Sequence, residues 1–361
     1  MLTKADDYPI HQTPEPIAYS GTDRNFYDRY FFNGYERDGD LFFAAALGVY
    51  PHLNVMDAAF SFLVDGAQHN LFASRVLHME RMDTRVGPIS VEVVKPLEVL
   101  TLRVDDPERA LRAELTFDAR FPPIEEPRFT RRVGASTVMD YTRLTQNGCW
   151  RGWIEFSGRR HQLEPHAWWG TRDRSWGVRP VGERDPQQNP YAEEPQFFWL
   201  WSPLNFEDRA TFFHLNADAN GEPWNTAGRV VTAEGTTECA TASSRLTFAS
   251  GTRWASEATI ELDDARISLT PGQNFYMKGI GYGHPEWSHG LYHGELATGF
   301  ESHDLAGMNP ADPTHFHIQA ICQATLTGAD GRTVHGKGIL EQLIIGPYAP
   351  CGFRELMDLA P

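Results

Sequence analysis

Short segments in which apolar and polar residues alternate recur along this chain, and they limit the folds open to it. The clearest examples lie at residues 89–106, 110–121, 209–218, 255–272 and 315–331. Alternation with a period of two places the apolar side chains on one face of a β-strand, and turn sequences such as DDPE, DANG and GADG favour antiparallel connections between strands. The pattern predicts a mostly β protein of sandwich or barrel type.

Other segments add little helix to this prediction. The apolar run LFFAAALGVY at 41–50 is too short to span a membrane and predicts a buried strand. Only residues 22–34 and 352–360 have features of short helices. Neither a dinucleotide-binding fingerprint nor a phosphate-binding loop occurs in the sequence.

The length of 361 residues exceeds the usual size of a single hydrophobic core. Residues 182–195 are polar, contain prolines and do not alternate, so they predict a hinge between two halves. We therefore expect two consecutive lipocalin-like β-barrel or sandwich domains with few short helices, at 1–185 and 186–361.

The charge and the cysteines restrict the partners and the compartment. A net charge of −16 without a basic block argues against nucleic acid or an anionic membrane surface as partner. The four cysteines are scattered and the N-terminus lacks the apolar centre of a signal peptide, which predicts reduced thiols in the cytoplasm and no integral membrane segment. A homodimer is left open.

The stretch EPHAWWGTRDRSWGVRP at 164–180 combines bulky rings with charges. Seven of the ten tryptophans fall between residues 150 and 201. Large rigid rings can line a pocket for an apolar ligand and stabilise a cation, but they also fill ordinary cores. Both interpretations of the tryptophans stay open at this point.

Asp173 is the candidate acid of this stretch. On a strand, Thr171, Asp173 and Ser175 would share one face, and the opposite face would carry Arg172, Arg174 and Trp176. A carboxyl among aromatic rings favours its neutral form and can donate a proton near neutral pH. The alternative is a structural ion pair, such as that of Asp173 with Arg179.

Three segments resemble one known superfamily. GTRDRSWG at 170–177, the preceding residues 141–168 and GKGILEQLIIGPYAPCGF at 336–353 are similar to carotenoid 1,2-hydratases (hydroxyneurosporene synthases), AttH-like proteins and lipocalin-type pericyclases. The resemblance implies two lipocalin-like domains. It also implies an enzyme that hydrates, cyclises or rearranges unsaturated, often isoprenoid, molecules without a redox cofactor.

The resemblance also implies roles for individual residues. The hydratases donate a proton from the aspartate of a Tyr-x-Asp element, which corresponds to Asp173, and their His-x-Trp pair resembles His166-Ala-Trp168. This chain has Thr171 at the tyrosine position, which favours an apolar substrate smaller than a carotenoid.

These residues give an expected mechanism that needs no cofactor and no metal. Neutral Asp173 would protonate an alkene or an allylic oxygen of an apolar small molecule, and water or proton loss would quench the cation. His166 is the candidate base or water-positioning residue. The expected substrate-binding residues are the rings that would shield the cation, the arginines that could hold a ligand oxygen and a pair on the neighbouring strand: Trp168, Trp169, Trp176, Arg172, Arg174, Arg179, Asp140 and Tyr141.

Histidines form a second group of candidate functional residues. Six of the fourteen lie at 284–317, and His315 and His317 would point to one side of a strand. Together with His293 or Glu295 they could bind a transition metal, but no known metal-binding spacing is present. Three function classes remain: a cofactor-independent lyase or isomerase as the leading one, a non-catalytic carrier of hydrophobic ligands, and a metal-dependent enzyme.

Overall fold

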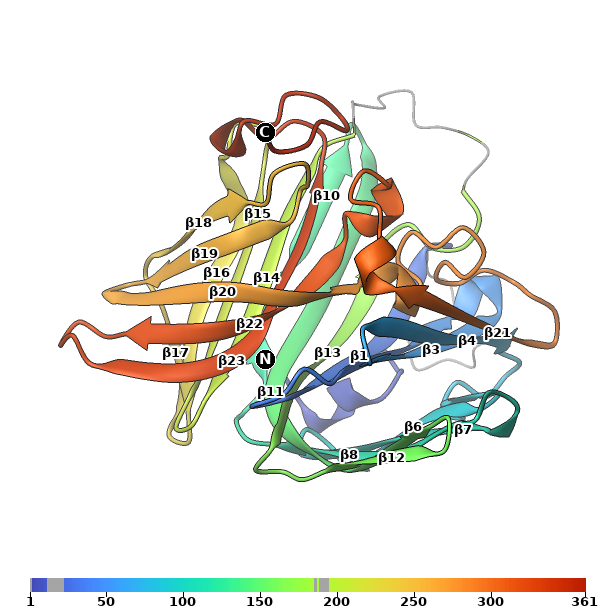
Figure 1. Cartoon of the computed structure of the whole chain (residues 1–361). Coiled ribbons are helices and arrows are strands. Elements are labelled where there is room, and N and C mark those ends of the chain that lie inside the picture. Colours follow the sequence, from blue (N-terminus) through green and yellow to red (C-terminus); the bar gives the residue numbers. More distant parts are fainter. Residues whose placement is uncertain (1, 12–22, 185–186, 188–194) are drawn as a thin grey trace. The chain divides into compact units, whose positions relative to one another are not determined.

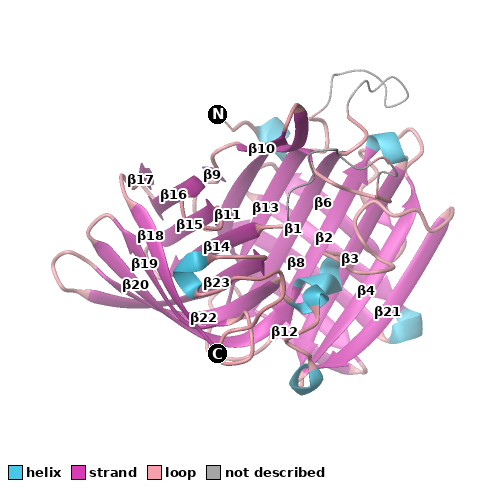
Figure 2. Cartoon of the chain, turned by 90° about the horizontal axis from the view of Figure 1, so that it is seen from above, coloured by secondary structure: helices cyan, strands magenta, loops and turns pink. Residues whose placement is uncertain are grey.

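The computed structural model describes residues 2–11, 23–184, 187 and 195–361, and strands make up most of them (Figure 1). The helices among these residues are 3₁₀ turns of three or four residues (Figure 2). None of them is long or apolar enough to cross a membrane. The turns are η1 (Lys4–Asp7), η3 (Pro51–Leu53), η4 (Pro107–Arg109), η5 (Met277–Ile280), η6 (Leu305–Gly307), η7 (Pro313–His315) and η8 (Ala349–Cys351).

The first sheet is antiparallel and follows the order β21-β4-β3-β2-β1-β13-β11-β8-β7-β6-β5, with β9, β10 and β12 also paired to β11. Its strands are β1 (Phe26–Glu36), β2 (Phe42–Tyr50), β3 (Val55–Val64), β4 (Ala67–Val76), β5 (Arg85–Val86), β6 (Ile89–Lys95), β7 (Val99–Asp106), β8 (Leu111–Ala119), β9 (Ile124–Glu125), β10 (Phe129–Val133), β11 (Ser136–Phe156), β12 (Arg159–Leu163), β13 (Trp168–Val178) and β21 (Leu296–Asp304).

The second sheet is also antiparallel and has the order β17-β16-β15-β14-β23-β22-β20-β19-β18. Its strands are β14 (Phe197–Phe206), β15 (Ala210–Ala217), β16 (Pro223–Thr232), β17 (Gly235–Glu238), β18 (Ala242–Phe248), β19 (Ala255–Leu262), β20 (Ala265–Tyr276), β22 (Ile318–Thr327) and β23 (Thr333–Ile345). Two curled antiparallel sheets, one nearly closed and one half-open, confirm the predicted mostly β fold.

The chain divides into two compact units. The first contains Met1–Ala192 and Gly279–His303, and the second contains Glu193–Lys278 and Asp304–Pro361. Residues 279–303, which the expected domain at 186–361 includes, pack with the first unit because β21 pairs with β4. Most of the predicted hinge at 182–195 lies outside the described residues.

Two-residue turns join several neighbouring strands. Asp65 and Gly66 connect β3 to β4 with φ values of 52° and 78°, and Ser157 and Gly158 connect β11 to β12 with 51° and 80°. Positive φ at both positions matches the right-handed twist of a hairpin, and Asp-Gly is a strong sequence signal for it. These turns fix the registers that place side chains on each face.

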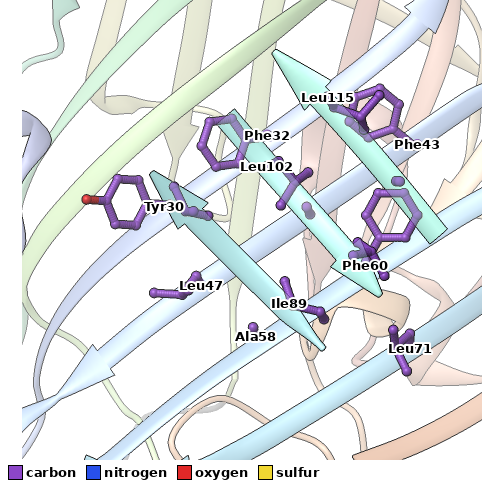
Figure 3. Close-up of a cluster of buried hydrophobic side chains, with 14 of the residues drawn as sticks. Tyr30, Phe32, Phe43, Leu47, Ala58, Phe60, Leu71, Ile89, Leu102 and Leu115 are labelled. Atoms are coloured by element: carbon purple, nitrogen blue, oxygen red, sulfur yellow. The ribbon is translucent and has the colours of Figure 1, made fainter. Parts of the chain in front are cut away.

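The core of the first unit lies where the curled sheet meets itself. Side chains of β1–β4 pack against side chains of β6–β8, as Figure 3 shows for Phe43, Phe60, Leu102 and Leu115. We call the sheet surface that carries these residues the core face. Trp150 and Trp168 belong to this core, so part of the tryptophan concentration fills the interior of the first unit.

The second unit has its own core, built from alternate residues of its strands. Phe198, Leu200 and Leu204 of β14 pack with Ile318, Cys322 and other buried residues of β22 and β23. The segments at 209–218 and 255–272 contribute β15, β19 and part of β20, as the alternation predicts.

The two predicted helices are wrong. Residues 26–36 form β1, which is buried from Phe26 to Tyr35, and residues 352–360 contain no helix. A strand that is buried on both faces does not alternate in polarity, so the aromatic run of β1 lacks the pattern that marks the other strands.

Candidate active site in the first unit

The side chains of β13 alternate as the sequence predicts. The register pairs Arg172 with Phe32 and Arg174 with Tyr30, which both lie on the core face. Asp173 therefore lies on the opposite face, between Phe31 of β1 and Thr145 of β11. A nearby guanidinium, that of Arg143, interacts electrostatically with it.

The two arginines of the core face are engaged by the N-terminal segment. Arg172 forms an ion pair of 2.5 Å with Asp7, and both side chains are fully buried. Arg174 pairs with Asp28 at 2.6 Å. Each of these two expected ligand-binding residues thus has a carboxylate partner in the N-terminal part of the chain. The Nη1 atom of Arg174 still has no hydrogen-bond partner in the described part of the chain.

The three tryptophans of the expected cation pocket are not gathered around Asp173. Trp168 lies in the core, and Trp176, also on the core face, stacks on His11 at 3.6 Å. Trp169 shares the face of Asp173 but lies between the guanidinium groups of Arg37 and Arg120. Trp169 thus lies on the opposite face of the strand from Trp168 and Trp176, which are at its two ends.

Two further expected residues also lie apart from Asp173. His166 is exposed in the turn before β13, and about 17 Å of extended strand separates Trp168 from Asp173. Asp140 accepts two hydrogen bonds from Arg128, at 2.6 and 2.7 Å, in an exposed ion pair. The Arg128 guanidinium lowers the pKa of Asp140, which is therefore an ionised surface group.

Tyr141 and Arg179, in contrast, lie near each other around Tyr27. The guanidinium of Arg179 lies 4.3 Å from the centre of the Tyr27 ring, and Tyr141 meets the same ring edge to face at 6.1 Å. Arg179 makes no ion pair with Asp173 or with any other described carboxylate. These two predicted residues mark one side of a larger polar cluster.

The centre of that cluster is a row of residues that crosses the sheet opposite the core face. Register pairs Arg29 of β1 with Gly48 of β2, and Gly48 with Asp57 of β3. Adjacent strands are about 4.8 Å apart, so roughly 10 Å of sheet separates the backbones of Arg29 and Asp57. Gly48 is the residue between them in this row, and the Tyr50 hydroxyl fills the space above it, since a Cβ at Gly48 would lie 2.2 Å from that oxygen.

Asp57 is held by hydrogen bonds to both carboxyl oxygens. Its Oδ1 accepts from the Tyr50 hydroxyl at 3.1 Å, and its Oδ2 accepts from the Gly290 N–H at 2.7 Å. The Nδ1 atom of His289 lies 3.9 Å from Oδ2. Burial raises the pKa of Asp57 to about 6, although the Gly290 N–H and Arg29 act to lower it.

A small cavity adjoins this carboxyl. Its volume is about 10 Å³, close to the size of one water molecule. The small side chains of Ala46 and Ala59 leave this space on the sheet surface. The lining is mainly apolar, with a few polar groups: Ala46, Asp57, Ala58, Ala59, Phe72, Ala73, Ser74, Ile280, Trp287, Ser288, His289, Leu291 and His293. An ionisable carboxyl at the edge of an apolar cavity is typical of a catalytic group.

The loop at residues 281–295 supplies the other side of the site. Tyr282 accepts a hydrogen bond of 2.6 Å from Arg29 Nη1 and meets His289 edge to face at 4.8 Å. Gly290 has a φ of 79°, and a Cβ there would lie 3.2 Å from the Gly182 nitrogen. Only glycine adopts this conformation without strain, and it directs the N–H of the loop to Asp57.

The two arginines of the cluster are incompletely paired. Arg29 is 1% exposed, yet its Nε and Nη2 atoms have no hydrogen-bond partner in the described part of the chain. The Nη2 atom of Arg179 is also without one, while its Nη1 donates to Tyr282 at 3.4 Å. A buried donor without a partner costs roughly 1–3 kcal/mol, which makes these groups candidates for ligand binding.

The six histidines at 284–317 do not form a metal site in the part of the chain that the structure describes. Within residues 2–11, 23–184, 187 and 195–361, no group of three His, Cys, Asp or Glu side chains is arranged to hold a metal ion. His315 ends the turn η7 and His317 precedes β22, so the prediction that both lie on a strand is wrong. His284 Nδ1 accepts the backbone N–H of Glu286 and Trp287, which gives it a structural role.

The sequence interpretation missed most of this cluster. Asp57 is the one charged residue of a mostly apolar strand, VMDAAFSFLV, and a charge at such a position is an available signal. His289 belongs to the six histidines at 284–317, and no pattern in the sequence singles out Tyr282. The pattern at 22–34 predicts a helix, so it contains no information on the register of Arg29 opposite Gly48.

Solved structures with the same fold come from several proteins. Kievitone hydratase from Nectria haematococca is 10% identical, with a TM-score of 0.55 and 88% of each chain covered. A putative AttH protein from Nitrosomonas europaea is 13% identical, with a TM-score of 0.55, and the match covers 93% of this chain and 98% of that one. CghA with Sch210972 is 12% identical, with a TM-score of 0.52 and 94% and 95% covered. These similarities confirm the fold that the resemblance implied.

Sequence comparison identifies a family. A model described as a family of unknown function (DUF8625) matches residues 2–354. The comparison with curated proteins gave no match.

Proposed function

We propose that this chain, which belongs to the family of unknown function DUF8625, is an acid–base enzyme. Its reaction would be of the hydratase, dehydratase, isomerase or cyclase type, with Asp57 as the group that transfers the proton. The observation that carries the proposal is the Asp57 carboxyl, fixed by Tyr50 and Gly290 at the edge of an apolar cavity. The shared fold with kievitone hydratase supports the reaction class.

Asp57 has the properties of a proton-transfer group. Its pKa of about 6 lets it exist in both protonation states near neutral pH, and such a group can accept a proton in one step and return it in another. The hydrogen bonds from Tyr50 and Gly290 fix the orientation of the carboxyl before substrate binds.

His289 and Asp173 have secondary places in the proposal. His289 lines the cavity next to Asp57 and would position a water molecule or a substrate oxygen. Asp173 lies one row further along the same sheet face, beside Phe31, and stays the alternative proton donor that the sequence predicts.

The substrate would be an unsaturated small molecule, and the proposed proton transfer requires no cofactor. The isoprenoid class, the cytoplasmic location and a homodimer stay predictions from the sequence. Phe72 and Trp287, whose rings stack at 5.6 Å, form one wall of the cavity, which at about 10 Å³ has room for one water molecule.

The test is an incubation in deuterated water with a panel of enones, cinnamic acids, monoterpenols and polycyclic alkenes, with products identified by mass spectrometry. We expect deuterium at carbon in a converted product and a loss of turnover of about 10²-fold or more in Asp57→Asn. Asp65→Asn is the matched control, because Asp65 is 76% exposed in the β3–β4 turn of the same unit.

Three results would contradict the proposal. If turnover survives in Asp57→Asn, Asp57 is not the proton-transfer group. If, in addition, turnover is lost in Asp173→Asn, the proton donor is Asp173. Retention of a panel compound without conversion would favour a carrier.

A further inference from the structure

We propose that Arg29 and Arg179 form an oxyanion site beside Asp57, and that the substrate is therefore an α,β-unsaturated carbonyl compound or acid. The inference rests on the proposed function of Asp57 and adds the chemical class of the substrate. Every residue that it uses lies in the first unit.

The two guanidinium groups converge on one phenol. Arg29 Nη1 and Arg179 Nη1 both donate to the Tyr282 hydroxyl, at 2.6 and 3.4 Å. The two groups also lie over the Tyr282 ring, 4.6 and 5.5 Å from its centre. Tyr282 thus holds the two cations near each other and leaves N–H groups of both for another acceptor.

The charge of this pair is not neutralised by an ion pair. Arg172 and Arg174 of β13 and Arg143 of β11 each have a carboxylate within 2.6 Å. Arg29 and Arg179 have none within ion-pair distance among the described residues, and Asp57 lies two strands from Arg29. An anionic oxygen would therefore find three buried N–H donors and uncompensated positive charge.

This electrostatic environment distinguishes between two reaction types. A carbocation beside two cationic guanidinium groups would be repelled, so protonation of an isolated alkene is disfavoured here. An enolate or a carboxylate would be stabilised, because negative charge develops where the N–H donors already lie. The site thus favours conjugate addition or elimination over the cationic route expected from the sequence.

The step balances with water as the co-reactant. Ionised Asp57 accepts one proton from water while the water oxygen bonds to the β-carbon, and the π electrons move to the carbonyl oxygen to give an enolate held by Arg29 and Arg179. The enolate then takes the proton from Asp57 at the α-carbon. The sum is addition of H₂O, and the reverse order is dehydration.

The binding test uses trans-cinnamate, methyl cinnamate and cinnamyl alcohol as probes, with dissociation constants from isothermal titration calorimetry at pH 7.5. We expect the wild-type protein to bind cinnamate at least tenfold more tightly than the ester or the alcohol. Arg29→Gln should abolish this preference, and Arg29→Lys should retain part of it. Arg159→Gln is the control, since Arg159 is 65% exposed on β12.

The outcome separates the two proposals. In Asp57→Asn the preference for cinnamate should persist or increase, because the variant removes a neighbouring negative charge without touching the arginines. Equal affinity for acid and ester in the wild-type protein, no binding of any probe, or a preference that survives Arg29→Gln would each overturn the oxyanion site. Such a result would leave the role of Asp57 to be decided by turnover.

The pH profile of any converted substrate gives a second readout. Conjugate addition needs ionised Asp57, so kcat/KM should fall as the pH drops below about 6. A cationic route would need the neutral acid and show the opposite limb. The charged and titratable groups around Asp57 and its cavity are Tyr50, Arg29, Arg179, His289 and His293. The variants His289→Gln and His293→Gln identify any contribution of an imidazole to the profile.

Discussion

Arg29 and Asp57 occupy one row of the sheet, with Gly48 as the only residue between them. The glycine leaves room for the Tyr50 ring, whose hydroxyl bonds to Asp57. On the far side of Arg29, the same row continues through Ser175 to Arg143. An acid and an unneutralised cation are thus fixed at a set distance by backbone pairing rather than by flexible loops.

Replacing Asp57 by asparagine should change how stability depends on pH. The pKa of Asp57 is about 6 in the folded protein and near 3.8 when unfolded, so the folded state binds the proton more strongly. The wild-type protein should therefore lose about 3 kcal/mol as the pH rises from about 4 to 6, and no more above that. Asp57→Asn should lack this loss.

Urea unfolding of both proteins at pH 4 and pH 7 checks this result. The wild-type protein should be the more weakened of the two on going to pH 7. Parallel pH dependences in the two proteins would show that the pKa of Asp57 is not raised.

Tyr50→Phe should move the ionisation of Asp57 to higher pH. The Tyr50 hydroxyl donates to the carboxylate and so lowers the pKa of Asp57 against the effect of burial. Removing this donor should shift the inflection of the pH–rate profile upward while the fold is retained, because the ring remains. The carboxyl ¹³C shift of Asp57 followed by NMR reports the same change without a substrate, and an unmoved midpoint would contradict it.

Gly48→Ala should disrupt the site more than it disrupts the fold. A methyl group there would lie 2.2 Å from the Tyr50 hydroxyl, which must then move away from Asp57. Overpacking of this kind costs about 1–3 kcal/mol, and turnover should fall with it. Gly307→Ala is the control, since a Cβ at Gly307 meets nothing within 4 Å. Thermal unfolding and turnover of both variants give the comparison, and equal behaviour would argue against a spacer role for Gly48.

The ion pair of Asp7 and Arg172 should prove structural. Removing one partner of a fully buried pair leaves an uncompensated charge, so Asp7→Asn or Arg172→Gln should each cost about 3–5 kcal/mol. The double variant should cost less than the sum of the two. A double-mutant cycle by urea unfolding measures the coupling. Additive effects, or a loss of probe binding without loss of stability in Arg172→Gln, would restore Arg172 as a ligand-binding residue.

Much of the fold was predictable from local pattern. The alternating segments gave the strands β6–β8, β15 and β19, because a half-buried strand repeats every two residues. The same alternation correctly separated Asp173 from Arg172 and Arg174. It failed at β1, where both faces are buried and aromatic residues lie on each of them.

The candidate site depended on pairing that no local pattern contains. The sequence by itself determined a β protein, the face on which each β13 side chain lies and the presence of unusual charges among apolar strands. Only the tertiary structure decided which charges meet: it paired Arg172 with Asp7 across 165 residues and placed Arg29 opposite Gly48 and Asp57. The reason is physical, since strand register and the approach of the loop at 281–295 are set by packing over the whole unit, and they determine which buried charges are neutralised.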